Sequence, residues 1–230
     1  MTTRDDILSF LRSPTRFAAT ATDRDLWVEG LDGFAIPSIA ATGDHSLRPA
    51  QDAAWRGLAD HRVGLVLGPP GTGKTHLLSW LIASFGAVRS ANGRPARTLV
   101  TAFTKNAVGN VLDAASKRQA VHDAAAPDPI YFGSPPSSGL ASGVQVLGRG
   151  DEADLAQEIA SGRAVIGATI WSLHRLINSG VLPTVDGPTA PLFDLVCIDE
   201  ASQMVLGHGL MALAGMAPDC RIVVYAAVEK

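Results

Sequence analysis

Lysine is scarce in this chain, and no dense run of positive charge occurs. The 19 basic residues include only four Lys, and the formal net charge at pH 7 is -3. Proteins that bind nucleic acid through a broad basic surface carry a clear positive excess, so the composition gives no support for such a surface. A local groove stays possible, because affinity depends on the charges that line the phosphate path and not on their sum.

Cysteine is also rare. The two Cys, Cys197 and Cys220, each lie in an apolar run. They have neither the spacing of metal ligands nor the density of a disulfide framework. We therefore expect a reduced, cytoplasmic compartment.

Long hydrophobic segments are missing as well. Residues 1–12 carry Arg4, Asp5 and Asp6 ahead of a short apolar patch, which is not the pattern of a signal peptide. No apolar run approaches the ~18 residues that a membrane span requires. With 230 residues and 47% hydrophobic content, the chain can bury one good core with an appended segment. We expect a soluble protein without a membrane partner.

One complete motif stands out against these absences. Residues 68–75 read G-P-P-G-T-G-K-T, which fits the phosphate-binding pattern G-x-x-x-x-G-K-[S/T]. The pattern needs Gly where the backbone approaches phosphate, Lys to reach the outer phosphates and a hydroxyl to hold Mg²⁺. An apolar, β-rich run precedes it and a helical pattern over residues 76–85 follows, which makes a chance Gly-rich turn the weaker interpretation. The motif predicts a nucleoside triphosphate site made by Gly68, Pro69, Pro70, Gly71, Thr72, Gly73, Lys74 and Thr75.

A second motif, which is acidic, is expected to complete this site. In L-V-C-I-D-E-A-S-Q, Asp199 comes directly after four apolar residues, where a buried strand should end. A triphosphate-bound Mg²⁺ takes the loop hydroxyl and an acidic residue at such a strand end, so we expect Thr75 and Asp199 to be its ligands. Glu200 then orients or deprotonates the attacking water. The alternative is that the two acidic residues cap a helix beginning near Ser202.

Predicted strands and helices alternate along the chain, which indicates an α/β fold: a P-loop NTPase with a parallel sheet of about five strands flanked by helices. The predicted strands cover residues 63–67, 98–103, 164–170, 192–198 and 221–228, and the predicted helices cover 49–58, 76–85, 105–119, 152–161 and 173–177. We read residues 1–46 as an appended N-terminal segment with a short helix at 5–11, and 47–230 as the nucleotide-binding domain. Segments rich in Pro, Gly and Ser predict a long surface insertion at 123–150 and a loop at 180–191.

Hydroxyl side chains follow the second and third predicted strands. Thr101 and Thr104 lie at the carboxyl end of the strand at 98–103, on the sheet edge that also carries the phosphate loop. They suit contact with a nucleic-acid backbone, although Thr104 equally suits the cap of the next helix. Thr169 and Ser172 repeat the pattern one strand later. Aromatic residues at core spacing, namely Trp55, Trp80 and Trp171, are expected to pack rather than to stack on bases. Tyr131 and Phe132 fall in the predicted surface insertion.

Together, D-E-A-S-Q, G-P-P-G-T-G-K-T and T-A-F-T-K-N-A-V resemble the first motor domain of superfamily 1 helicases, specifically the 5′-to-3′ group that includes RNA-surveillance and flap-processing helicases. The likeness spans roughly residues 47–225. It implies a RecA-like domain that binds ATP with Mg²⁺ and hydrolyses ATP to drive movement along single-stranded DNA or RNA. It also implies that Gln51 contacts adenine, that Thr101, Thr104 and Asn106 grip the strand, and that Gln203 senses the γ-phosphate.

The chain departs from this family after its last predicted strand. R-I-V-V-Y is followed by A-A-V-E-K, where the family has G-D-x-x-Q-L-P and then a second motor domain. In this family the second domain supplies arginine fingers, and movement along the strand needs both domains. We therefore expect slow hydrolysis by this chain alone. We also expect a second RecA-like domain as partner, in cis or in trans. The alternatives are a stand-alone P-loop ATPase or nucleotide-responsive binding module without unwinding activity, and a structural relic that binds no nucleotide. The choice between DNA and RNA, and the polarity of movement, stay open.

Overall fold

A seven-stranded parallel sheet forms the centre of the molecule. The computed structural model describes residues 18–122, 126–180, 192–213 and 216–227. The strands are ordered β1-β7-β6-β2-β5-β3-β4, and every neighbouring pair is parallel. Their bounds are β1 Val63–Leu67, β2 Ala96–Ala102, β3 Ile130–Phe132, β4 Gln145–Leu147, β5 Arg163–Thr169, β6 Phe193–Asp199 and β7 Met216–Ala226. The predicted α/β class with a parallel, helix-flanked sheet is confirmed.

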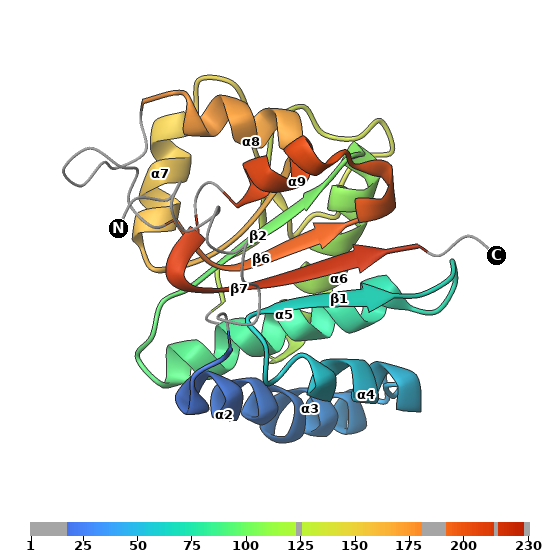
Figure 1. Cartoon of the computed structure of the whole chain (residues 1–230). Coiled ribbons are helices and arrows are strands. Elements are labelled where there is room, and N and C mark those ends of the chain that lie inside the picture. Colours follow the sequence, from blue (N-terminus) through green and yellow to red (C-terminus); the bar gives the residue numbers. More distant parts are fainter. Residues whose placement is uncertain (1–17, 123–125, 181–191, 214–215, 228–230) are drawn as a thin grey trace.

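Helices cover both faces of this sheet (Figure 1). One face carries α5 (Lys74–Ala91) and α6 (Lys105–His122), and the other carries α7 (Glu152–Ala160), α8 (Ile170–Ile177) and α9 (Leu206–Ala212). All five predicted strands and the helices after them are present, with ends shifted by a few residues. Among the described residues, no helix is long and apolar enough to cross a membrane.

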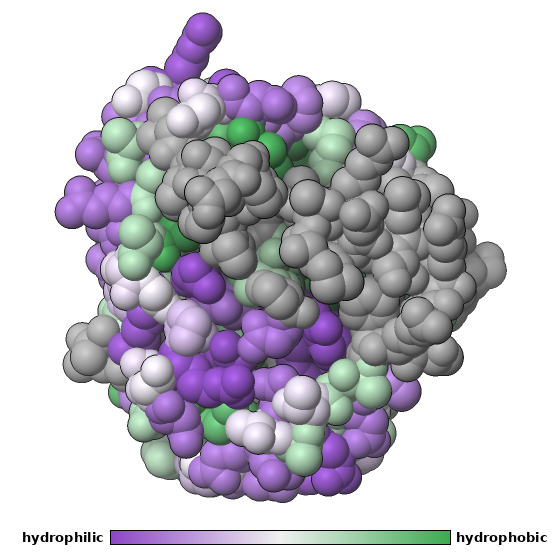
Figure 2. Space-filling model, turned by 60° about the vertical axis from the view of Figure 1, so that its left-hand side comes forward, coloured by the Kyte–Doolittle hydropathy of each residue, from purple (hydrophilic) through white to green (hydrophobic). Residues whose placement is uncertain are grey.

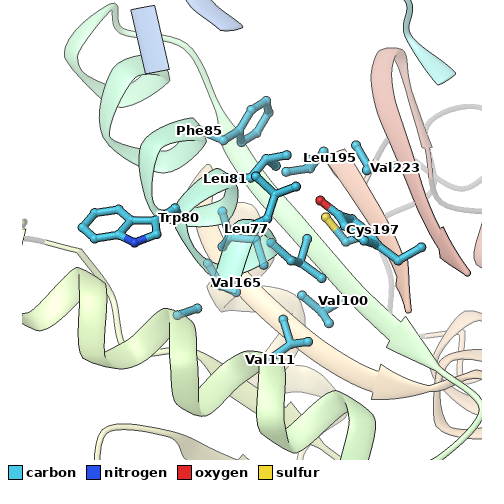
Figure 3. Packing of buried hydrophobic residues seen from close by; sticks show 14 of the residues in the cluster. Leu77, Trp80, Leu81, Phe85, Val100, Val111, Val165, Leu195, Cys197 and Val223 are labelled. Carbon is cyan, nitrogen blue, oxygen red and sulfur yellow. The ribbon is translucent and has the colours of Figure 1, made fainter. Parts of the chain in front are cut away.

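Helix α5 is buried along most of its length, because almost every residue from Leu77 to Phe85 is apolar or small. Its side chains meet the strands in the main core, where Leu77, Leu81, Val100, Leu195, Cys197 and Val223 come together (Figure 3). Trp80 points away from the sheet, toward α6, and is fully buried there. This packing fixes the first turn of α5 against the carboxyl edge of the sheet.

The predicted surface insertion at 123–150 contains two strands that sequence analysis missed. β3 pairs with β5, and β4 extends the sheet beyond β3. Tyr131 and Phe132 are 1% and 0% exposed. Neither side chain therefore lies on a surface that a nucleic acid can reach. The error arose because three-residue strands between Pro-rich stretches leave no alternating pattern to detect.

Residues 21–57 form a helical layer on the outer side of α5 (Figure 1). The layer consists of α2 (Ala21–Glu29), a π-helix η2 (Gly30–Ala35), α3 (Ile36–Thr42) and α4 (Pro49–Gly57). Trp27 and Trp55 join it internally, since each indole N–H donates to the backbone carbonyl of the other residue, at 3.0 and 3.2 Å. The helix predicted from Pro49 is confirmed as α4. The predicted helix at 5–11 and nearly all of the predicted loop at 180–191 lie outside the described residues.

Buried charged side chains at the amino edge of the sheet have hydrogen-bond partners within the protein. Asp194, at the start of β6, accepts hydrogen bonds from the backbone N–H and the Nε–H of Arg97, at 2.9 and 2.8 Å. Arg221 donates to the carbonyls of Leu58 and Ala59 at the end of α4, at 2.9 and 3.0 Å. Figure 2 brings this side of the molecule forward, and much of the described surface there is hydrophilic.

Candidate functional site

The phosphate loop spans residues 68–73, between the end of β1 and the start of α5. Gly71 and Gly73 have φ angles of 79° and 80°, a region that favours Gly. A Cβ on Gly68 would stand 2.9 Å from the hydroxyl of Thr72. The first backbone N–H that the helix itself uses is that of Leu77, which bonds to Gly73 O at 3.0 Å. The earlier N–H groups at the start of α5 therefore point at the loop, as an anion site requires.

The ammonium of Lys74 lies inside this loop. Its Nζ donates to the carbonyls of Gly68 at 2.7 Å and Pro69 at 3.1 Å. The Thr72 hydroxyl donates to the same Pro69 carbonyl at 2.8 Å. A positive charge, helix N–H groups and the dipole of an 18-residue helix thus converge on one small volume.

Gln51 ties α4 to the phosphate loop. Its Nε2 donates to the carbonyls of Thr72 and Gly73 at 3.3 and 2.9 Å, while its Oε1 accepts from the backbone N–H of Arg48 at 2.8 Å. The side chain is 8% exposed. The resemblance predicted that Gln51 contacts adenine. The structure places Gln51 against the loop, and its hydrogen bonds within the described residues are all to backbone atoms.

Asp199 ends β6 at the same edge. Side chains alternate along a strand, and Asp199 shares its face with Leu195 and Cys197, which pack in the core that contains α5. Only β7 lies between β6 and β1, so the two strands are about 10 Å apart. Asp199 therefore projects toward the side on which α5 begins, and the positive charge of Lys74 reaches it electrostatically.

The Asp199 carboxylate is buried without a strong partner. It is 7% exposed, and its one hydrogen bond in the described part of the chain comes from the backbone N–H of Glu200, at 2.9 Å. Burial raises the pKa of Asp199 above its usual value, the Glu200 N–H lowers it, the charge of Glu200 raises it, and that of Lys74 lowers it. A carboxylate that burial makes costly to ionise is one that a bound cation stabilises.

Glu200 adopts an unusual backbone conformation. Among the described residues it is the one non-Gly residue with a positive φ, 52°. Its Oε2 accepts a hydrogen bond from the Thr104 hydroxyl at 3.0 Å. The alternative reading of Glu200 as a helix cap does not hold, because its side chain makes no capping bond to the 3₁₀ helix η3 (Ala201–Gln203) that follows. Gln203 closes η3, and its side chain is exposed.

Thr101 does not reach the surface, which corrects the predicted nucleic-acid contact. It pairs with Ala168 on one side and with Ile198 on the other, so it lies in the middle of the sheet and is 0% exposed. Its buried hydroxyl has no partner in the described part of the chain. Thr104 and Asn106 come after the strand ends, where Thr104 is half-buried and Asn106 is exposed. Sequence spacing could not separate the last strand residues from the first loop residues.

Trp171 is another correction, because it was expected to pack in the core. Trp55 and Trp80 are buried as expected, at 1% and 0%, whereas Trp171 is 58% exposed. It stands in the first turn of α8, and its ring meets that of His208 edge-on with centroids 4.9 Å apart. Phe103, which follows β2, is 39% exposed and lies 6.1 Å from the same His ring. We call Phe103, Trp171 and His208 the aromatic rim.

Thr169 and Ser172, the weaker candidates for backbone contact, bond to each other. Thr169 caps α8 by accepting from the Ser172 N–H at 3.4 Å, its hydroxyl lies 3.3 Å from the Ser172 Oγ, and it is 7% exposed. The aromatic rim beside them was not found by sequence reasoning. The signal available was an aromatic residue within two positions of a predicted strand end, at the edge where parallel sheets bind ligands.

The site suits Mg²⁺ held jointly by protein and phosphate. Magnesium prefers oxygen ligands and commonly takes one or two from the protein, the others coming from phosphate and water. Asp199 and Thr75 offer a carboxylate and a hydroxyl at this edge. In the described ranges, no group of three or more His, Cys, Asp or Glu forms a metal site without phosphate.

Comparison with known families agrees with this geometry. The family model described as an AAA domain matches residues 51–224, a span that runs from Gln51 to β7 and includes the phosphate loop, Asp199 and Glu200. No curated protein matches the chain. P-loop NTPases in general bind ATP with Mg²⁺. Because the match covers well over half of the sequence, the chain belongs to the AAA domain family of P-loop ATPases.

Proposed function

We propose that this chain is the ATP-binding motor domain of a superfamily 1 helicase, which hydrolyses Mg²⁺-bound ATP to drive movement on single-stranded nucleic acid. The observation that carries the proposal is Asp199, a buried carboxylate that faces the start of α5 and has no cationic side chain in hydrogen-bonding range among the described residues. A structural Asp is normally paired when it is buried. This arrangement is what a cation-binding carboxylate requires, and P-loop ATPases use one.

Each residue of the site then has a defined task. Lys74 exchanges its two loop carbonyls for phosphate oxygens, and the free N–H groups at the start of α5 bind the β-phosphate side. Thr75 and Asp199 hold Mg²⁺, which supplies charge neutralisation on the phosphates. Glu200 positions the water and accepts its proton. Gln51 holds the loop next to the base, and Gln203, three residues after Glu200, responds to the γ-phosphate.

Support for a nucleic-acid substrate comes from the aromatic rim. Exposed apolar side chains are informative when they lie together, and here Phe103 and Trp171 both contact His208. They follow the neighbouring strands β2 and β5, on the edge that carries the phosphate loop. Bases stack on such rings with little dependence on sequence, at about 1–3 kcal/mol per base. Asn106 and Thr104 lie beside Phe103 and can donate hydrogen bonds to phosphate oxygens.

The proposal includes a second RecA-like domain, in cis or in trans. Translocation needs two domains that close and open on the strand, and an arginine finger from the partner adds roughly 10³ to 10⁵ in rate. The alternative is a stand-alone P-loop ATPase or nucleotide-responsive module. In that case the aromatic rim binds another ligand, and nucleic acid leaves turnover unchanged.

The deciding experiment measures ATP turnover with and without poly-dT and poly-U. Stimulation by either polymer supports the motor domain, and the stronger polymer identifies the substrate class. Lys74→Ala serves as the control, because it removes the phosphate-binding charge and should lose nucleotide affinity. Tight ATP binding with turnover that neither polymer changes would favour the stand-alone ATPase, and absence of ATP binding by folded protein would reject both.

A further inference from the structure

Two exposed leucines lie on the edge strand β1. This strand comes first in the sheet order, so among the described strands it has one neighbour, β7 (Figure 1). Leu65 and Leu67 are 60% and 58% exposed, and we call them the leucine pair. An edge strand that presents apolar side chains to water promotes aggregation, and proteins normally cover such a strand with a helix or a loop. The leucine pair therefore marks a surface that requires a partner.

The leucine pair lies on the face of the sheet that carries α7, α8 and α9. Side chains alternate along a strand, so the pair points the same way as Val63, which packs against the core of that face. Val66 points the other way and packs against the main core. Helices α7 and α8 lie on β5, and α9 lies on β6. The described helices therefore leave the leucine pair uncovered.

The described part of the chain starts next to β1. Ala18 forms an antiparallel bridge with His61, and the N–H of Ala19 donates to the carbonyl of Asp60 at 3.1 Å. Because the bridge is antiparallel, the chain traced backwards from Ala18 is directed along β1 toward the leucine pair. The strand is about 17 Å long, and residues 12–17 span up to about 20 Å when extended. Residues 5–11 can therefore reach the leucine pair.

The sequence of residues 5–11 has an apolar side that matches this surface. It reads D-D-I-L-S-F-L, for which we predict a short helix. With about 100° of turn per residue, its apolar residues fall within an arc of roughly 160°, and the polar residues fall opposite. The apolar residues are Ile7, Leu8, Phe10 and Leu11. A helix this short is not stable alone in water, so it forms by packing its apolar side on another surface.

We propose that residues 5–11 dock on the leucine pair as an amphipathic helix and so cover the open face of β1. The occupant is a segment of the same chain, because the anchor at Ala18 holds it beside this strand at a high effective concentration. A second copy of the chain has to compete with that tethered segment. The inference does not depend on the proposed function. It gives the N-terminal segment a task, which is to close the sheet over the strand that leads into the phosphate loop.

Thiol labelling of Leu65→Cys in the full chain tests the docking. The two natural Cys are 0% and 1% exposed, so the introduced thiol is the one that a maleimide reaches. The reference is Val121→Cys in α6, a position that is 63% exposed. Because a covered thiol reacts only when its cover opens, we expect Leu65→Cys to label more slowly than Val121→Cys, on the order of tenfold.

Leu8→Glu combined with Leu11→Glu should detach the helix, because the two substitutions place charge on its apolar side. In this background Leu65→Cys should label as fast as Val121→Cys. Ser9→Glu is the matched control, since it adds a charge to the polar side of the same predicted helix. It should leave the labelling of Leu65→Cys slow.

Two results would overturn the inference. Fast labelling of Leu65→Cys in the otherwise unchanged chain means that nothing covers the leucine pair. Slow labelling that Leu8→Glu with Leu11→Glu does not change means that residues 5–11 are not the cover. If that slow rate also decreases as the protein concentration rises, a second copy of the chain is the occupant instead.

Discussion

The two ends of β6 each carry a buried Asp, and the two carboxylates differ in their partners. Asp194, at the amino end, is 2% exposed and forms a charged pair with Arg97, with bonds of 2.8 and 3.1 Å to its side chain. Asp199, at the carboxyl end of the same strand, is 7% exposed and receives one backbone N–H. Where the protein satisfies its own polar groups the edge is structural, and where it leaves them unsatisfied the edge is available to a ligand.

The rest of each edge follows the same division. At the amino edge, Arg221 lies 4.6 Å from the ring of Trp27 while it donates to carbonyls at the end of α4. At the carboxyl edge lie the free N–H groups of α5, the strained Glu200 and the exposed Trp171. Stability and chemistry are thus separated along the strands, as expected for a parallel sheet whose ligands bind beyond its carboxyl ends. Four substitution experiments test this division.

The largest effect is expected at Glu200. Glu200→Gln keeps the size of the side chain but cannot accept the proton of water, so kcat should fall by about 10²- to 10⁴-fold. ATP binding should persist, and the nucleotide should stay trapped unhydrolysed. Turnover and binding of a fluorescent ATP analogue measure the two quantities, with Lys74→Ala as the variant that loses binding. Equal hydrolysis by Glu200→Gln and the parent would remove Glu200 from its role.

The next largest effect is expected from substitutions of Trp27 and Trp171, which compare the amino and carboxyl edges of the sheet. Trp27→Ala removes a buried ring with a satisfied indole N–H and should lower the free energy of unfolding by about 3–5 kcal/mol. Trp171→Ala removes a ring that is 58% exposed, so stability should change by no more than about 0.5 kcal/mol. Its effect should appear in affinity for single-stranded nucleic acid, at about 1–3 kcal/mol. Chemical denaturation and fluorescence titration separate the outcomes, and a large stability loss in Trp171→Ala contradicts the comparison.

The two Asp residues give the sharpest test. Asp194→Asn removes the buried carboxylate charge that pairs with Arg97 and should destabilise by about 3 kcal/mol, the low end for a broken buried pair, because Arg97 keeps some solvent contact. Asp199→Asn should instead raise the thermal midpoint of nucleotide-free protein at neutral pH, because burial disfavours the charge that it removes. It should also abolish stabilisation by Mg²⁺ with ATP.

The pH dependence of the Asp199→Asn effect has a definite sign. The pKa of Asp199 in the folded protein is raised above 3.8, so the folded state binds its proton more tightly than the unfolded state does. The destabilisation that the buried Asp199 charge causes is therefore present above the pKa of Asp199 in the folded protein. It disappears as the pH falls below 3.8. A stability difference between variant and parent that is the same at acid and neutral pH would contradict this assignment.

The smallest effect concerns His76, next to Thr75 in α5. Burial lowers its pKa below 6.5, the charge of Arg118 lowers it further, and Arg118 Nη2 lies 2.9 Å from His76 Nδ1. The unfolded chain then binds the His76 proton more readily than the folded protein does. The stability that neutral His76 contributes is therefore fully present above pH 6.5 and is lost as the pH falls through the pKa of His76 in the folded protein. His76→Gln should show a weaker loss of thermal stability on acidification than the parent. An identical acid loss would exclude His76 as its cause.

The phosphate loop shows how much local sequence can determine. Gly71, Gly73 and Lys74 act through backbone conformation and position in a strand–loop–helix unit, so seven or eight consecutive residues specify the geometry. The end of β6 at Asp199 could likewise be predicted from the sequence, because four apolar residues before a carboxylate indicate where a buried strand leaves the core. These features were predicted from sequence for a physical reason: the interactions that form them are local.

Other features depended on which strands became neighbours. Thr101 and Thr104 are three residues apart, yet β5 and β6 enclose Thr101, while Thr104 lies past the strand end within 3.0 Å of Glu200. The sequence by itself determined the α/β alternation, the phosphate loop and the acidic pair. Only the tertiary structure decided the exposure of Trp171, the pairing of β3 with β5, and the bond between Thr104 and Glu200. Exposure and long-range contact depend on what packs against a residue, and no window of sequence contains that information.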